Sequence, residues 1–206
     1  MKIEFNSKYF IENSNGVSAN EEILNIISSF LDEKRYKHCL SVGTLAYKIA
    51  ISNNLKDPIK YYFAGIVHDI GKNLDNNSEY INKYLSEEEK KYPKYMYHQF
   101  LGYYLVKEIF SLDDEYILNA IKYHCSGRKN MSAIEKIIYS SDKMSQSELQ
   151  NAILTDYNLM KKLYVQYENF LDFYINRKTK KYKFSFHFNG SNYIFEQESR
   201  QKAINE

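Results

Sequence analysis

Residues 61–72 read YYFAGIVHDIGK, an apolar run that ends in a histidine, an aspartate, a glycine and a lysine. Just before it, Asp57-Pro58 fits a helix N-cap followed by proline at the first helical position. We therefore expect a helix from Pro58 to about residue 70, ended by Gly71 and followed by a polar loop at 73–77. Its apolar face leads directly to His68, so a buried helix would carry the His68-Asp69 pair into the interior.

Helical periodicity continues on both sides of this run. Apolar residues recur at helical spacing over 21–33, 35–52, 97–110, 113–123, 132–143 and 155–176. Two capping boxes, Ser86 with Glu89 and Ser132 with Glu135, fit helix starts at which serine and glutamate satisfy each other's backbone donors. The pattern predicts a mainly α domain, a helical bundle over residues 21–176.

The period changes from 3.6 to 2 after residue 176. Tyr182, Phe184 and Phe186 alternate with polar residues, and the turn pair Asn189-Gly190 follows, which predicts a β-hairpin. Residues 1–20 carry a weak strand pattern, so we expect the two termini to share a small sheet. The expected organisation is an extension at 1–20, the helical domain at 21–176, and a hairpin with a tail at 177–206. The apolar stripe of the hairpin would pack within the chain, with a homodimer contact as the alternative.

Composition excludes several classes of partner. The 28 Lys+Arg and 26 Asp+Glu give a net charge of +2, without the basic excess of a dedicated nucleic-acid binder. No apolar run approaches the roughly 20 residues of a membrane span, and the start is too polar for a signal peptide. The cysteines, Cys39 and Cys125, have no CxxC spacing, which excludes a disulfide framework and a zinc ribbon. We expect a cytoplasmic protein with no membrane contact, in which both cysteines are small core residues turned about 100° away from the histidines they follow.

The histidines and two aspartates form a pattern. A lone histidine on a helix is usually structural, but four of the five histidines fall on predicted core faces together with two aspartates: His38, His68, Asp69, His98, His124 and Asp142. Buried carboxylates without partners are costly, and a metal centre gives the whole set one explanation. His187 falls on the polar face of the hairpin and is not expected to be a ligand.

Six ligands are too many for one ion that keeps an open position. A carboxylate has two oxygens and can bridge two ions, which an imidazole cannot, so Asp69 and a hydroxide could bridge two ions about 3.5–4 Å apart. Nitrogen and oxygen ligands favour iron, manganese or zinc, and ligand type alone does not choose among them.

The order of these residues resembles the signature of HD-domain metal-dependent phosphohydrolases. Three segments, 35–38, 68–72 and 124–142, are similar to the YqeK-type HD proteins, and the similarity extends over about residues 22–174. The resemblance implies a helical HD-domain fold and a symmetrical bis(5′-nucleosyl)-tetraphosphatase with a di-iron centre, which splits diadenosine tetraphosphate into two ADP.

The resemblance also implies a role for each matching residue. His38, His68, Asp69 and Asp142 would hold one ion, and Asp69, His98 and His124 the other, with iron expected and manganese or zinc as alternatives. Asp69 and Lys72 would be catalytic, beside a hydroxide nucleophile activated by both ions. Arg35, Lys72 and Arg128 would contact the nucleotide's phosphates, although Lys72 could instead complement a helix dipole.

Two departures from the family pattern concern the substrate. Residues 143–147 read KMSQS where the family usually has a Glu-Pro-x-Arg segment, and Gln99 stands where glycine is common. Neither touches an expected metal ligand. A nucleotidase acting on a mononucleotide, or an HD fold kept as a binding module, are the alternative functions.

Overall fold

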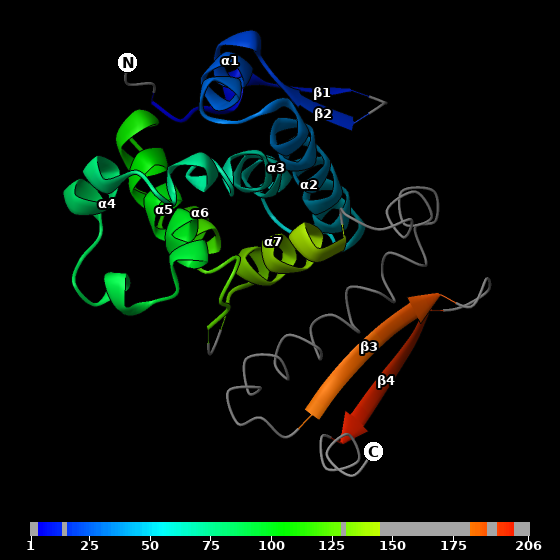
Figure 1. Cartoon of the computed structure of the whole chain (residues 1–206). Helices are drawn as coiled ribbons and strands as arrows, with labels where there is room; N and C mark the ends of the chain where they lie inside the picture. Colours follow the sequence, from blue (N-terminus) through cyan, green and yellow to red (C-terminus); the bar gives the residue numbers. More distant parts are fainter. Residues whose placement is uncertain (1–3, 14–15, 129–130, 145–181, 189–192, 200–206) are drawn as a thin grey trace.

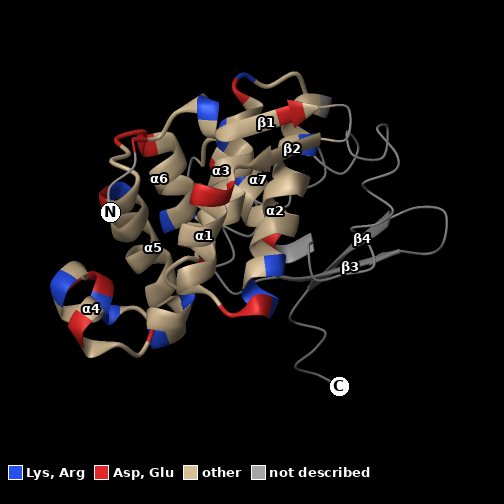
Figure 2. Ribbon diagram, turned by 90° about the horizontal axis from the view of Figure 1, so that it is seen from above, with Lys and Arg blue, Asp and Glu red and all other residues tan. Residues whose placement is uncertain are grey.

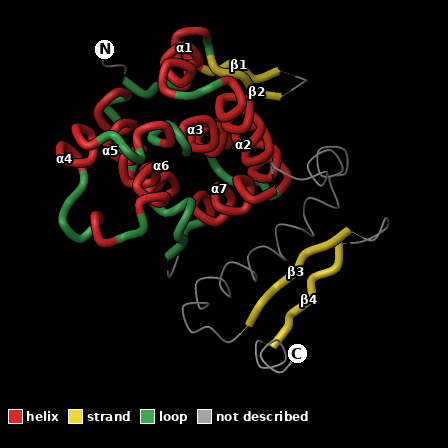
Figure 3. Tube along the Cα trace, viewed as in Figure 1, coloured by secondary structure: helices red, strands yellow, loops and turns green. Residues whose placement is uncertain are grey.

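In the computed structural model, residues 4–13, 16–128, 131–144, 182–188 and 193–199 are described (Figure 1). Helices dominate, with short strands near both ends of the chain (Figure 3). The α-helices are α1 Glu21–Phe30, α2 Glu33–Ser52, α3 Pro58–Val67, α4 Ser78–Tyr84, α5 Tyr97–Ile109, α6 Glu115–Lys122 and α7 Ala133–Met144. The 3₁₀ turns are η1 Ser7–Tyr9, η2 Lys72–Leu74, η3 Glu89–Lys91 and η4 Lys94–Met96, and the strands are β1 Phe10–Asn13, β2 Gly16–Ala19, β3 Tyr182–Phe188 and β4 Tyr193–Ser199. The predicted mainly α fold is confirmed.

Side-chain caps set several of the helix starts. The Asn20 and Asp32 side chains accept hydrogen bonds from Ile23 N and Arg35 N, at 3.1 and 2.8 Å. The cap at Asp32 explains why the helix expected over 21–33 already ends at Phe30, because Asp32 begins α2. The capping box of Ser132 and Glu135 forms as predicted at the start of α7.

The end of α3 differs from the prediction. The helix stops at Val67, three residues early, and residues 68–71 form a turn that leads into η2. Asp57 stands before Pro58 as expected, but its φ of 52° is left-handed and its side chain makes no cap hydrogen bond. The early end of α3 matters for the site. Adjacent side chains in a turn can point in the same direction, whereas adjacent side chains in a helix point about 100° apart.

The segment between α3 and α5 is also organised differently from the prediction. Helix α4, which the periodicity did not indicate, follows an Asn77 cap. The capping box of Ser86 and Glu89 forms, yet it opens only the 3₁₀ turn η3. Glu89 is instead held by Lys122 of α6 at 2.6 Å, so this connection is fixed by a tertiary ion pair.

Helix α3 lies at the centre of the core. Every residue from Tyr61 to Val67 is buried, and α2, α5, α6 and α7 surround the helix in Figure 1. Helices α2 and α3 approach closely because a glycine stands on each: a Cβ built on Gly65 would lie 2.5 Å from Gly43 Cα. This close contact sets the position of α3 relative to α2, and with it the position of the residues that follow α3.

The strands form two separate antiparallel sheets among the described residues. β1 pairs with β2, and β3 pairs with β4 in a register that sets Phe188 opposite Tyr193. The predicted C-terminal hairpin is confirmed, but the prediction of one sheet shared by the two termini is wrong. The helix expected at 155–176 and the turn at Asn189-Gly190 lie outside the described residues, and the division at 1–20, 21–176 and 177–206 stays a prediction.

Charge is spread over the described part of the chain. Lysines, arginines, aspartates and glutamates alternate along the ribbon in Figure 2, in keeping with the near-neutral balance of the sequence. Within the described residues, none of the helices has the length and apolar character needed to cross a bilayer.

Candidate metal centre

Six side chains from five parts of the chain meet in the core. His38 comes from α2, His68 and Asp69 from the turn after α3, His98 from α5, His124 from the turn after α6, and Asp142 from α7. The four imidazole rings form a row in which each ring contacts the next. The ring centroids are 5.3 Å apart for His38 and His68, 4.9 Å for His68 and His124, and 5.1 Å for His124 and His98. The structure thus brings together all six residues that the sequence selected.

The first group of ligand atoms lies between α2, α3 and α7. Asp142 Oδ1 is 3.0 Å from His38 Nε2 and 3.5 Å from His68 Nε2, and His68 Nε2 is 3.6 Å from Asp69 Oδ2. Ligands that bind one ion at about 2.0–2.2 Å lie about 3.0–3.5 Å apart around it. These spacings fit one cation.

The second group faces the other oxygen of Asp69. Asp69 Oδ1 is 3.4 Å from His98 Nε2 and 3.3 Å from His124 Nε2, and the two Nε2 atoms are 3.2 Å apart. Three nearly equal distances of this size suit three ligand atoms on one face of a coordination polyhedron.

Asp69 therefore connects the two groups. Its Oδ2 belongs to the first group and its Oδ1 to the second, while the side chain is only 4% exposed. A carboxylate that divides its two oxygens in this way suits a bridge between two cations.

Hydrogen bonds behind the rings turn the ring nitrogens toward the centre. The Nδ1 atoms of His68 and His124 donate to the carbonyl oxygens of Gly65 and Ile121, each at 2.7 Å. In the neutral imidazole this leaves Nε2 with a lone pair and no proton. The buried Nε2 of His68 makes no hydrogen bond to the described residues, so the donor set is one that a metal ion would satisfy.

The charges in the centre depend on one another. Burial disfavours charge on Asp69, but the facing imidazoles of His68, His124 and His98 hold its pKa well below the usual range. Burial is the largest cause that lowers the pKa of His124 to about 4, and positive charge on His68 or His98, when either ring is protonated, acts in the same direction. Burial acts the same way on His98, yet Asp75, Cys125 and Asp69 together raise its pKa to about 9. Asp69 stays anionic at neutral pH, as a cation ligand must.

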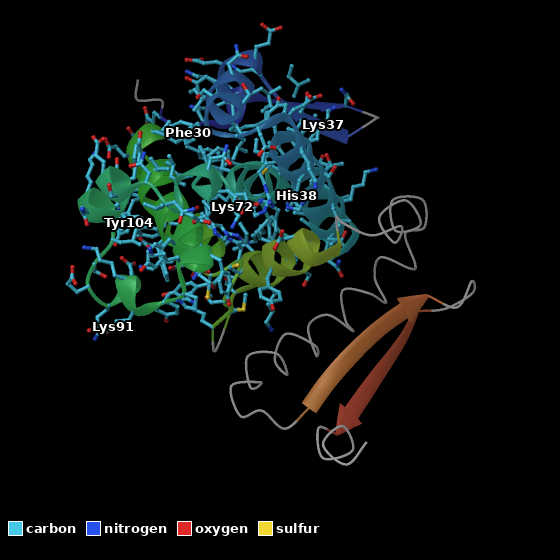
Figure 4. All side chains as sticks on the ribbon, in the orientation of Figure 1. Phe30, Lys37, His38, Lys72, Lys91 and Tyr104 are labelled. Atoms are coloured by element: carbon cyan, nitrogen blue, oxygen red, sulfur yellow. The ribbon has the colours of Figure 1, made fainter. Side chains whose placement is uncertain are left out.

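The three predicted phosphate-binding cations border this centre differently. Arg35 Nη1 lies 2.7 Å from Asp69 Oδ2, directly against the carboxylate that faces both groups. Lys72 Nζ donates to Asp75 Oδ2 at 3.0 Å and lies 3.1 Å from His98 Nδ1, near the middle of the helical body in Figure 4. The proposed role of Lys72 in complementing the dipole of α3 does not fit, because α3 ends at Val67 and Lys72 begins η2.

Arg128 lies in the loop between the turn after α6 and helix α7. Its Nε donates to Glu135 Oε1 at 2.6 Å, and its guanidinium lies over the Tyr123 ring at 4.6 Å. Glu135 is buried and also caps α7 through Ser132, so the capping box and the arginine share one carboxylate. Arg128 is thus fixed in direction, two residues beyond the turn that carries His124.

Two nearby residues were missed in the sequence. Asp75 Oδ1 lies 3.4 Å from His98 Nδ1, behind the ring. The sequence offered only one indication of Asp75, its position three residues after Lys72. Cys125 was expected to be a core residue turned away from His124, which is wrong: it is only partly buried, and its sulfur lies within 4.8 Å of one ring nitrogen each of His98 and His124. The 100° rule fails because His124 and Cys125 lie in a turn after α6 and not in the helix. Cys39 is fully buried, as predicted.

Two further predictions concern Gln99 and His187. Gln99 is fully buried, and its Oε1 accepts a hydrogen bond from Ser126 N at 3.1 Å, so it braces the turn after His124. His187 lies on β3 opposite Ile194, and its side chain is outside the described residues.

Comparison with protein families matches residues 35–147 to the HD domain. The matched segment begins three residues before His38 and ends five residues after Asp142, so it contains all six residues of the centre.

Two relatives at about 35% identity have related names. The chain is 36% identical over 126 residues to the "Probable nicotinate-nucleotide adenylyltransferase/Ap4A hydrolase" of Mycoplasma genitalium, covering 60% of this chain and 35% of that one. It is 34% identical over 129 residues to the symmetrical bis(5'-nucleosyl)-tetraphosphatase of Bacillus subtilis, covering 59% and 67%. The chain thus spans only about a third of the mycoplasma protein.

A solved structure agrees in fold. A predicted HD superfamily hydrolase involved in NAD metabolism, from Clostridium acetobutylicum, superposes with a TM-score of 0.57 at 33% identity, covering 77% of this chain and 88% of that one.

Proposed function

Because the chain belongs to the HD-domain family, we propose that it is a metal-dependent phosphohydrolase that cleaves dinucleoside polyphosphates, with diadenosine tetraphosphate split symmetrically into two ADP. The observation that carries this proposal is the division of Asp69 between two groups of imidazoles. The name of the Bacillus subtilis relative supports the choice of substrate.

His38, His68, Asp69 and Asp142 would hold one ion, and Asp69, His98 and His124 would hold the other. Two such ions, when bound, lower the pKa of a water molecule and withdraw charge from phosphate oxygens. We propose iron as the native metal, with manganese or zinc as alternatives that nitrogen and oxygen ligands also accept.

The protein's own part in the reaction is to hold these groups rigidly. Gly65 O and Ile121 O fix the ring orientations of His68 and His124, and Asp75 Oδ1 lies 3.4 Å from Nδ1 of His98. Fixed rings need no rearrangement as the reaction proceeds, which is the main source of electrostatic catalysis.

Cationic side chains would hold the polyphosphate. Arg35 borders the first group through Asp69, and Arg128 is directed by Glu135 and Tyr123. Lys72 lies beside the second group and, in a complex, would exchange Asp75 for a phosphate oxygen. Nucleotide binding through a few such residues requires no basic surface, consistent with the net charge of +2.

The experiment is a substrate screen on protein reconstituted with iron, manganese or zinc, with products separated by chromatography. We expect ADP as the product of diadenosine tetraphosphate, with loss of activity in His68→Ala and Asp142→Ala. ATP plus AMP would indicate asymmetric cleavage and contradict the proposal. A clear preference for mononucleotides would instead establish a nucleotidase. Protein that binds none of these metals and hydrolyses none of the nucleotides would favour a binding module.

Two further predictions remain open to direct measurement. We propose a cytoplasmic location, and a homodimer as the alternative to packing of the β3–β4 hairpin within the chain. Sedimentation of the full chain and of a form ending at residue 176 tests the second point: a dimer that becomes a monomer on truncation supports the homodimer, and an unchanged monomer contradicts it.

A further inference from the structure

Cys125 lies beside the second group of ligand atoms. Its sulfur and one nitrogen each of His98 and His124 lie within 4.8 Å of one another, and both histidines are buried. A hydrogen bond from Gly127 N to Tyr123 O closes the turn that holds Cys125 on the same side as His124. The cysteine therefore belongs to a cluster of three ligand-bearing side chains.

The two groups of the centre are unequal without this sulfur. The first has two imidazoles, the shared Asp69 and an anion of its own, Asp142. The second has two imidazoles and the shared Asp69 alone. The second group has no carboxylate that corresponds to Asp142, and Cys125 lies beside this group.

Charge balance favours an additional anion. Two carboxylates offset only half the charge of two divalent ions, and Arg35, 2.7 Å from Asp69, adds a further positive charge. The ligand side chains are largely buried, where uncompensated charge is costly. A thiolate from Cys125 would reduce this excess at the second ion.

We propose that Cys125 is a thiolate ligand of the second ion. This ion would then be held by His98, His124, the shared Asp69 and an anion, the Cys125 thiolate, that does not contact the first ion. This inference rests on the proposed metal centre and adds a ligand to it. An ion bound at about 2.0–2.1 Å by nitrogen and 2.3 Å by sulfur sets these atoms about 3.5 Å apart, so metal binding would draw the sulfur of the half-buried Cys125 toward the two imidazoles. The thiolate is the ligand form, so binding releases the thiol proton to solvent.

The consequence is a change in metal preference. Thiolate favours zinc and ferrous iron, whereas manganese prefers oxygen. The second ion should therefore discriminate against manganese more strongly than the first, whose ligands are only nitrogen and oxygen.

X-ray absorption of the zinc-loaded full chain tests the ligand directly. We expect a sulfur neighbour at about 2.3 Å in the wild type and in Cys39→Ala, and only nitrogen and oxygen neighbours in Cys125→Ser. Cys39→Ala is the matched control because it removes the other buried thiol beside the histidines. A sulfur signal that survives Cys125→Ser, or its absence from zinc-loaded wild type, overturns the inference.

Thiol alkylation gives a second readout, independent of activity. In the Cys39→Ala variant Cys125 is the single cysteine of the chain, and zinc should slow its alkylation at least about tenfold. An alkylation rate unchanged by stoichiometric zinc contradicts the inference.

Cys125→Asp tests the predicted metal preference. This variant gives the second group the same ligand types as the first, so the ratio of zinc to manganese affinity should fall about tenfold or more. An unchanged ratio contradicts a sulfur ligand. Failure of the wild type to bind any metal would sink the proposed function itself, whereas metal binding without sulfur would sink only this inference.

Discussion

At the scale of single residues, Asp69 has a position that none of the other five candidate ligands shares. Its two oxygens face different imidazole groups, while Asp142 faces only the first. Replacing Asp69 should therefore disturb both metal positions, and replacing Asp142 only one.

We predict different metal contents for these two variants. Asp142→Ala should retain about one ion per chain and Asp69→Ala less than one, and kcat/KM should fall more than about a hundredfold in both, since loss of outer partners alone costs up to that much. Elemental analysis after dialysis measures the content. Asp113→Ala, which removes a side chain that is 90% exposed, is the control expected to match the wild type. Two ions retained in Asp69→Ala would contradict the bridging role.

At the scale of secondary-structure elements, the contact between α2 and α3 positions the centre. A Cβ on Gly65 would lie 2.5 and 2.7 Å from backbone atoms of Gly43, and backbone cannot yield as a flexible side chain can. Gly65 O also receives the hydrogen bond that orients His68. Gly65 therefore contributes both to the packing of α2 against α3 and to the orientation of His68.

Gly65→Ala is expected to reduce both stability and metal affinity. Overpacking should lower the free energy of unfolding by about 2–3 kcal/mol, and displacement of Gly65 O should tilt His68. Thermal and denaturant unfolding measure the first effect, and zinc titration the second. Gly102→Ala is the matched control: its Cβ would meet the Ile121 side chain at 3.0 Å, so a smaller loss is expected. Equal losses in both variants would contradict the backbone argument.

The connection between α4 and α5 depends on an ion pair. Burial opposes ionisation of Glu89, but Lys122 at 2.6 Å and the hydrogen bonds from Ser86 lower its pKa. A carboxyl whose pKa is lowered on folding stabilises the protein above its unfolded pKa, and this contribution disappears as pH falls through the folded value.

Glu89→Gln should accordingly be destabilising in a pH-dependent way. At pH 7 we expect a loss of about 2 kcal/mol, the scale of a hydrogen bond to a charged group. The difference from wild type should shrink as the pH falls below the ordinary glutamate pKa of about 4.3. Urea unfolding from pH 3 to 8 provides the measurement. Glu87→Gln, which removes an exposed carboxylate paired with Lys90, should be nearly neutral throughout. A pH-independent deficit in Glu89→Gln would show that packing, and not charge, holds the segment.

At the scale of the whole molecule, the centre ties distant parts of the chain together. The six candidate ligands come from α2, α5, α7 and the turns after α3 and α6, so a bound ion would link residues up to 104 positions apart in sequence. Ions that bind only the folded state stabilise it by mass action.

Metal loading should therefore raise the melting temperature. With free zinc at about 100 times its dissociation constant, one site contributes about 2.7 kcal/mol. For a chain of this size that is about 5–10 °C, removed again by a chelator and visible by calorimetry. Asp69→Ala should show little shift. An equal shift in that variant would mean that zinc stabilises the protein from elsewhere.

Much of the molecule follows from local pattern. Helical periodicity predicted six of the seven α-helices among the described residues, and missed α4, which has only seven residues. Period-2 alternation predicted the hairpin. The six candidate ligands could be chosen because polar groups on apolar helix faces must meet in a core, where they need a common partner.

The remaining features depend on contacts between residues far apart in the sequence. The early end of α3, the anchoring of Glu89 by Lys122 and the separation of the two sheets are tertiary outcomes. The sequence by itself determined which side chains are buried, because periodicity reports the face of an element. Only the tertiary structure decided that the two oxygens of Asp69 face different imidazole groups and that Cys125 lies near His98 and His124. The physical reason is that the directions of side chains in turns are set by the packing around them and not by helical spacing.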